Sequence, residues 1–250
     1  MQWGTALLRT AGGDSPRLEA ELLLAHVLSV ERAYILAHPE HNLSPAESAR
    51  YRQLIHRRAQ HEPLAYLLGH QEFYGLDFYV SPAVLIPRPE TELLVEEALA
   101  AARTSSSRPW CVADVGTGSG AIAVSLAVHV PHARVYATDA SAEALAVAEE
   151  NCRRHGVSER VILLQGHLLS PLPEAVDCIV ANLPYVSHAE WDSLPAEIAV
   201  YEPRAALDGG PDGLKYIGEL LASAAPYLRP KGVILLEIGS AQGAVVRKLA

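Results

Sequence analysis

The chain has 250 residues, half of them hydrophobic and a fifth charged, which is typical of a soluble globular protein with one large or two modest domains. A net charge of −9 argues against a large nucleic-acid-binding surface, because such a surface needs a basic face. No apolar run is long enough to span a membrane, and residues 1–4 lack the basic-then-apolar order of a signal peptide. The three cysteines are far apart and form no CxxC pair, which indicates neither a disulfide framework nor a zinc site and favours a reducing cytoplasm.

The first part of the chain, residues 1–66, predicts a small helical bundle. Apolar residues recur with helical spacing between Leu18 and Leu28, directly after the start signal Asp14-Ser15-Pro16. Ser44-Pro45-Ala46-Glu47 forms a capping box that opens a second helix through about Gln60. No carboxylate or cysteine partners its histidines at metal spacing, so we expect core or surface roles and no metal for His26, His56 and His61.

Residues 67–108 predict a linker made of a β-hairpin and a helix. Residues 73–80 place aromatic, β-prone residues around a glycine, which is typical of a hairpin. Residues 84–92 then lead into an apolar-periodic helix through Ala102, and residues 104–108 form a short flexible link. Helix-start chemistry explains the prolines and the acids of this stretch, but it does not explain Arg88 between two prolines.

Residues 109–250 predict a domain that binds a nucleoside-containing cofactor. A strand over 111–115 leads directly into a glycine-rich turn, and a small-residue helix follows over 121–130. The next strand, 134–139, ends in an acid about 20 residues after the glycines, where an acid can bind ribose hydroxyls. A purely structural turn is the alternative. The expected cofactor-binding residues are Gly116, Thr117, Gly118, Ser119, Gly120 and Asp139.

The glycine spacing favours one cofactor over another. A dinucleotide site wants G-x-G-x-x-G, whereas residues 116–120 read G-x-G-x-G and follow Asp114, a pattern that resembles S-adenosylmethionine-dependent methyltransferases. After the third strand, 161–165, that class often has an acid near the adenine. Here His167 and Leu168 stand in its place, so we expect adenine recognition by stacking and backbone contacts.

The fourth apolar strand, residues 178–181, ends in the tetrapeptide Asn182-Leu183-Pro184-Tyr185. A polar residue at the carboxyl end of a buried parallel strand lies where open α/β sheets bind ligands. The Asn182 side-chain oxygen and the Leu183 carbonyl would be two adjacent acceptors for a planar NH2 group, and Tyr185 would supply a ring face. A plain strand-to-loop turn with a proline stop is the alternative. The fold expected is α/β, with a doubly wound, mostly parallel Rossmann-like sheet.

Three segments resemble the HemK-type protein glutamine methyltransferases: 63–95 with its IPRPETE stretch, 114–127 with DVGTGSG, and 201–217 with YEPRAALDGGPDG. The resemblance implies methyl transfer from S-adenosylmethionine to the side-chain amide nitrogen of the glutamine in the Gly-Gly-Gln motif of peptide chain release factors. The family usually has Asn-Pro-Pro-Tyr, and Leu183 in place of the first proline loosens the local backbone. Asn-Leu-Pro-Tyr also resembles ribosomal RNA adenine dimethylases, so an RNA or DNA adenine methyltransferase is the alternative.

The resemblance also implies roles for single residues. The catalytic residues would be Asn182, Pro184 and Tyr185, and Leu168 and Asn182 would join the cofactor site. The methyl acceptor would be held by Asn182, Leu183, Pro184, Tyr185, Arg88 and Glu90, with Pro89 and Thr91 completing the wall. The helical bundle would help to grip the release factor, and neither a membrane nor direct nucleic-acid contact is expected.

The fifth strand, residues 232–238, is nearly all apolar, and a helix over 241–250 follows it. Proteins of the resembled family continue into two more strands that cover the free side of this strand. We therefore expect a C-terminally truncated methyltransferase domain whose fifth strand is a sheet edge, and such an edge is a template for self-association.

Overall fold

The structure is a computed structural model that describes residues 1–105 and 109–249. It contains two compact units. The first, called the helical unit, comprises Met1–Gly69 and Pro195–Tyr201; the second, called the catalytic unit, comprises His70–Leu194 and Glu202–Ala250. The link expected over 104–108 falls mostly on residues 106–108, which lie outside the described residues, as does the last residue of the helix expected over 241–250.

The helical unit is built on two long helices whose starts match the sequence signals. Helix α2 begins at Pro16, and helix α4 begins at Pro45 behind a complete capping box between Ser44 and Glu47. Their apolar faces meet in a core of Leu23, Ile55 and their neighbours. The predicted bundle is confirmed. Its helices are α1 (Gln2–Thr10), α2 (Pro16–Leu28), α3 (Arg32–Ala37), α4 (Pro45–Ala59), α5 (Leu64–Leu68) and α9 (Ala196–Tyr201).

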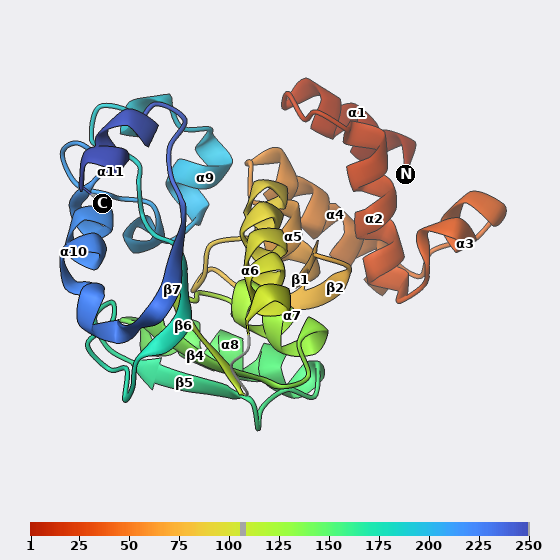
Figure 1. Cartoon of the computed structure of the whole chain (residues 1–250). Coiled ribbons are helices and arrows are strands. Elements are labelled where there is room, and N and C mark those ends of the chain that lie inside the picture. The colour runs from red at the N-terminus through yellow and green to blue at the C-terminus, as the bar shows by residue number, and fades with distance from the viewer. Residues whose placement is uncertain (106–108, 250) are drawn as a thin grey trace. The chain divides into compact units, whose positions relative to one another are not determined.

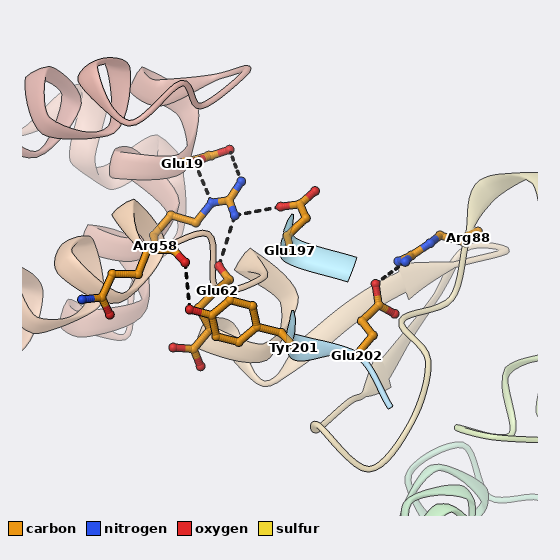
Figure 2. A network of polar contacts seen from close by, with 8 residues as sticks. Glu19, Arg58, Glu62, Arg88, Glu197, Tyr201 and Glu202 are labelled. Carbon is orange, nitrogen blue, oxygen red and sulfur yellow. Dashed lines mark hydrogen bonds and ion pairs between the residues drawn. The ribbon is translucent and has the colours of Figure 1, made fainter. Parts of the chain in front are cut away.

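Helix α9 joins this unit from a distant part of the chain (Figure 2). Arg58 donates to Glu19 at 2.9 and 3.1 Å and to Glu197 of α9 at 2.9 Å. The Tyr201 hydroxyl donates to the Gln60 carbonyl at 2.8 Å. Nothing in the local sequence of residues 195–201 indicates this placement.

The catalytic unit opens with the predicted hairpin, β1 (His70–Phe73) and β2 (Leu76–Tyr79). Tyr74 and Gly75 both have positive φ, as a two-residue hairpin turn of type I′ requires. The first strand begins before the aromatic residues that predicted it, because the polar residues His70 to Glu72 also pair in register with β2. A 3-10 turn η1 (Pro89–Thr91) then leads into helix α6 (Glu92–Thr104).

A five-stranded parallel sheet forms the centre of the catalytic unit, in the order β5-β4-β3-β6-β7. Figure 1 labels β4, β5, β6 and β7 of this sheet. The chain runs outward from β3 to β5 and then returns to the other side of β3 for β6 and β7. The predicted doubly wound α/β fold is confirmed. The strands are β3 (Trp110–Val115), β4 (Ala133–Asp139), β5 (Val161–Gln165), β6 (Val176–Asn182) and β7 (Leu228–Glu237).

Alternate residues of the strands feed two cores, one on each face of the sheet. Val112 and Val180 belong to the core that includes α6 and α7, whereas Ala113 and Ile179 belong to the core that includes α10. Both faces are covered, which explains why the central strands are apolar throughout. The remaining helices are α7 (Ala121–His129), α8 (Ala142–Arg154), α10 (Lys215–Ser223) and α11 (Gly243–Leu249), with 3-10 turns η2 (Trp191–Ser193), η3 (Arg204–Ala206) and η4 (Ala225–Tyr227). Over residues 1–105 and 109–249, no helix combines the length and apolar character needed to cross a membrane.

Candidate active site

A cavity of about 810 Å³ lies at the carboxyl ends of the strands in the catalytic unit. It is bordered by the loops after β3, β4 and β6, where the direction of strand order reverses between β3 and β6. Open α/β sheets bind ligands at this point because the loops on the two sides diverge there. The residues that line the cavity all belong to the catalytic unit, and they include Gly116–Ser119, Asp139, Leu168, Asn182, Leu183, Pro184 and Arg88.

The glycine-rich turn brings bare backbone to the cavity. Gly116, Gly118 and Gly120 all have positive φ, at 74°, 55° and 79°. A side chain at Gly116 would meet Leu183 at 3.2 Å, whereas a Cβ at Gly118 would meet nothing within 4 Å. Close packing on one side and open backbone on the other fit a site where a bound cofactor approaches the main chain.

Asp139 ends β4, as predicted, and it lines the cavity. One carboxylate oxygen accepts from the Gly118 amide at 2.9 Å, and the other accepts from the Ser141 amide at 2.9 Å. Two backbone donors on opposite sides fix the direction of this carboxylate. Each oxygen keeps further acceptor capacity, which is what ribose hydroxyls need.

Asp114 lies beneath the turn and is only 1% exposed. Its Oδ2 accepts from the Thr117 hydroxyl at 2.6 Å and from the Ala123 amide at 3.1 Å, whereas its Oδ1 has no partner within the described residues. Burial raises the pKa of Asp114 to about 7, against the two hydrogen bonds, which lower it, and the charge of Asp139 adds to the rise. The Asp114 carboxyl therefore changes protonation state close to neutral pH.

The tetrapeptide stands at the carboxyl end of β6, with three of its residues on the cavity wall. The Asn182 Nδ2 donates to the Thr91 hydroxyl at 3.0 Å, so its Oδ1 is the atom left for a ligand. Leu183 is 4% exposed and packs against Gly116, so packing holds it where the family has a proline. Leu183 and Pro184 line the cavity beside Asn182.

Tyr185 is half-buried, and it is not among the residues that line the cavity. Its hydroxyl donates to Glu237 at 3.2 Å. Burial, followed by the charge and the hydrogen bond of Glu237, raises the pKa of Tyr185 to about 12. Tyr185 is therefore a hydrogen-bond donor at neutral pH, and Glu237 fixes the end of its side chain.

The loop after α9 encloses the backbone of the tetrapeptide. A Cβ atom at Gly213 would clash with the Tyr185 carbonyl oxygen, and one at Gly209 would meet the Pro184 carbonyl oxygen at 2.7 Å. Gln242 donates to the Tyr185 carbonyl at 3.1 Å. Only glycine allows these two segments of the chain to approach so closely, which explains why glycines stand at these positions of the DGGPDG segment.

Arg88 lines the cavity and forms an ion pair with Glu202, whose side chain is 1% exposed (Figure 2). Glu202 also accepts from the Ile86 amide at 3.0 Å, so it fixes the IPRPETE stretch at two points. Glu90 is exposed and is not among the cavity-lining residues.

The expected adenine region is formed by the loop after β5. Leu168 lines the cavity with a positive φ of 48°, and its carbonyl accepts from the Thr138 hydroxyl at 2.9 Å. His167 also lines the cavity and contacts Glu219 at 2.8 Å. Within the described part of the chain, no three His, Cys, Asp or Glu side chains come together as metal ligands would.

Glu237 and Glu202 contribute to the site, although the sequence did not single them out for it. Glu237 has a signal that could have revealed it, because it ends an apolar strand as Asn182 does and pairs with Asn182 in register. Polar residues at the carboxyl ends of adjacent parallel strands lie side by side. Glu202 has no such signal, because its contacts reach 114 and 116 residues back along the chain.

Comparison with known proteins places the chain in a family. Residues 1–69 match the family model described as the PrmC N-terminal domain, and residues 90–211 match the methyltransferase small domain. The release factor glutamine methyltransferase of Moorella thermoacetica is 53% identical over 99% of this chain and 87% of its own length. The protein of the same name from Geobacter sulfurreducens is 44% identical over 98% of this chain and 85% of its own.

A solved methyltransferase from Pyrococcus furiosus aligns with a TM-score of 0.49 at 19% identity, covering 81% of this chain and 85% of that one. Sequence identity to the curated relatives is far higher and extends over nearly the whole chain. The chain therefore belongs to the release factor glutamine methyltransferase family and is an S-adenosylmethionine-dependent methyltransferase.

Proposed function

We propose that the methyl acceptor is the side-chain amide nitrogen of the glutamine in the Gly-Gly-Gln motif of peptide chain release factors, held by Asn182 and Leu183. The observation that carries this proposal is the hydrogen bond of the Asn182 NH2 group to Thr91, which leaves the oxygen of this cavity-lining residue to accept from a ligand. With the adjacent Leu183 carbonyl, it offers two acceptors to a planar group that has two N–H donors.

The residues present fit S-adenosylmethionine. The fixed Asp139 carboxylate would take the ribose hydroxyls, and the open backbone at Gly118 would allow the cofactor to approach closely. The wall formed by His167 and Leu168 would hold the adenine. When bound, this cofactor supplies a methyl group that the positive charge of the neighbouring sulfur has already activated.

Placement would be the main catalytic contribution of the protein. An amide nitrogen is a weak nucleophile because its lone pair is delocalised. Holding the nitrogen in line with the methyl group therefore lowers the activation barrier strongly, and such positioning contributes roughly 7–11 kcal/mol in favourable cases. The Asn182 oxygen and the Leu183 carbonyl would each accept one amide N–H. These bonds strengthen as positive charge develops on the nitrogen, so they favour the transition state over the ground state.

The alternative acceptor, an adenine amino group in RNA or DNA, has the same NH2 chemistry. The net charge of −9 counts against it, because nucleic-acid binding draws much of its affinity from basic side chains on phosphates. The family named by the relatives also supports the protein acceptor.

We assign recognition of the release factor partly to the helical unit. The catalytic unit contains the whole cavity, so the separate bundle needs another role. Its exposed Trp3 contacts the His56 ring at a centroid distance of 5.5 Å and the Arg52 guanidinium at 5.8 Å. An anchored aromatic residue is a typical contact for a protein partner.

One assay tests the proposed acceptor. The protein is incubated with labelled S-adenosylmethionine and either a release factor or ribosomal RNA, and intact mass then locates the label. We expect one added methyl group on the release factor and none on a variant carrying Gly-Gly-Ala. Label on the RNA, or on the Gly-Gly-Ala variant, would overturn the proposed acceptor.

Two further parts of the proposal concern assembly and location. Strand β7 is at the edge of the sheet, with Val233 38% exposed, and we propose that the 250-residue chain self-associates along it. Light scattering with and without Ile234→Lys tests this, and a monomer at high concentration would contradict it. The buried, unpaired state of Cys111, Cys152 and Cys178 supports a cytoplasmic location.

A further inference from the structure

A chain of hydrogen bonds runs behind the amide-binding face of Asn182. The Asn182 Nδ2 donates to the Thr91 hydroxyl at 3.0 Å, and that hydroxyl donates to Glu237 Oε2 at 2.7 Å. The other carboxylate oxygen of Glu237 accepts from the Tyr185 hydroxyl at 3.2 Å. Thr91 is 5% exposed, so water does not compete for its hydroxyl.

The chemistry of these groups determines the direction of every bond. A carboxylate only accepts, so the single proton of Thr91 goes to Glu237. The Thr91 oxygen can then only accept from its other neighbour, and Asn182 must turn its NH2 group toward it. The nitrogen and oxygen of an asparagine amide are otherwise nearly interchangeable in shape, so the hydrogen-bond partner decides which way the amide faces.

Three separate elements bring these residues together. Asn182 and Glu237 are the last residues of the adjacent strands β6 and β7 and pair in register. Thr91 comes from the 3-10 turn η1 at the start of α6. Groups held by strands and a helix start keep their geometry better than groups on free loops.

We propose that Thr91 and Glu237 are positioning residues that set the amide orientation of Asn182 for methyl transfer. The inference rests on the proposed function, because an amide acceptor needs an oxygen from Asn182. A reversed Asn182 would present N–H donors to the N–H donors of the substrate, and binding in the productive geometry would be lost. Glu237 also holds Tyr185, so one carboxylate would align both ends of the tetrapeptide.

Substitutions at Thr91 separate orientation from packing. Thr91→Val keeps the shape but removes the hydroxyl, so kcat should fall about tenfold or more while cofactor affinity and Tm stay near wild type. Thr91→Ser restores the hydroxyl and should restore most of the turnover. Thr104→Val makes the same change on α6 at a hydroxyl that bonds only to the Ala101 carbonyl among the described contacts, and it should have no effect. Glu237→Gln should lower kcat as Thr91→Val does.

A second readout does not depend on the substrate. The chain has three asparagines, so labelling them with ¹⁵N gives three side-chain NH2 signals, and the Asn182→Asp variant identifies that of Asn182. The NMR signal of the Asn182 NH2 proton that is hydrogen-bonded to the Thr91 oxygen should shift in Thr91→Val and stay in place in Thr91→Ser.

The outcomes separate the two proposals. A wild-type protein that leaves release factors unmethylated, with the NMR shift present, would overturn the proposed acceptor and keep the orientation. An unchanged NMR signal and unchanged kcat in Thr91→Val would overturn the positioning role and leave the acceptor standing. Loss of Tm and cofactor affinity together with kcat, or failure of Thr91→Ser to restore turnover, would reduce Thr91 to a structural residue.

Discussion

The two units surround a buried acid with different hydrogen-bond donors, charged in one unit and neutral in the other. In the helical unit, Glu21 is fully buried and bonded to Arg17 and Arg32, each at 2.8 Å. In the catalytic unit, Asp114 is equally buried, but its donors are the neutral Thr117 hydroxyl and Ala123 amide, and one of its oxygens has no partner in the described structure.

The consequence is seen in the ionisation of the two acids. Burial acts to raise the pKa of Glu21, yet the hydrogen bonds and charges of Arg17 and Arg32 outweigh it and hold that pKa below its usual value. For Asp114, burial prevails and the pKa rises to about 7. A buried acid that is paired with arginine stabilises the fold. A buried acid with only neutral donors can change its protonation state when a ligand binds, and acids with such perturbed pKa values are common at functional sites.

The largest effect is expected on turnover, when a neutral polar contact in the catalytic unit is removed. Asn182→Ala removes the acceptor for the substrate amide, so kcat should fall by about 10²–10³-fold, the usual cost of losing one transition-state hydrogen bond in an active site. Cofactor affinity and Tm should change little, because the Gly116–Gly120 turn and Asp139 remain. Steady-state kinetics and calorimetry measure these quantities, and near-normal turnover would show that the amide slot is wrongly assigned.

The second largest effect should be a loss of folding stability that leaves the active site unchanged. Glu21→Gln removes the charge that Arg17 and Arg32 contact, and it should cost roughly 1.5–3 kcal/mol, as for hydrogen bonds to a charged group, because both arginine side chains are exposed and return to water. Scanning calorimetry should show a lower unfolding temperature with unchanged cofactor binding. Glu40→Gln, in an exposed loop of the same unit, is the matched control. Equal stability of the two variants would show that the arginines do not stabilise the unit through Glu21.

These residues also show what a sequence can reveal. The Ser44 capping box, the Tyr74-Gly75 turn and the Gly116–Gly120 loop were predictable, because each depends on neighbours within a few residues. The sheet followed from apolar runs separated by helical periodicity. Asn182 could be placed because a parallel strand brings its last residue to the ligand edge.

Contacts between distant segments were not predictable. Thr91 and Glu237 are 146 residues apart, and Arg58 and Glu197 are 139 apart. The local sequence of each residue does not indicate which distant residue it contacts, and only the assembled sheet or bundle selects the pair. The orientation of Asn182 depends on such a contact, so the sequence could predict that the amide oxygen accepts from the ligand but not which residues hold the amide in that orientation.

A smaller effect should appear in the pH dependence of stability. The folded pKa of Asp114 is about 7 and its ordinary value is 3.8, so the folded state holds an extra proton between these values. Its contribution to stability is therefore complete below pH 3.8 and is lost as pH rises toward 7, by at most about 1.4 kcal/mol per pH unit. Glu21, with a lowered pKa, has the opposite slope and loses its contribution as pH falls.

The Asp114→Asn variant isolates this slope. Asparagine keeps an acceptor for Thr117 and Ala123 and places an NH2 group where the proton would be, so it resembles the protonated acid. Urea unfolding from pH 5 to 8 should show the wild type losing stability relative to the variant as pH rises. Parallel curves would mean that Asp114 keeps an ordinary pKa in the folded protein.

The smallest effect tests the comparison inside the helical unit, where Arg58 joins two acids of different exposure. The Glu19 side chain is 10% exposed and that of Glu197 in α9 is 44% exposed. Because solvent screens an exposed pair, Glu197→Gln should cost only about 0.2–1 kcal/mol of unfolding free energy, whereas Glu19→Gln should cost clearly more. Urea unfolding of both variants and of Arg58→Lys measures this. If Glu197→Gln were the more destabilising, α9 would owe its place in the bundle to this ion pair, and burial would not be what decides the value of a charge in this unit.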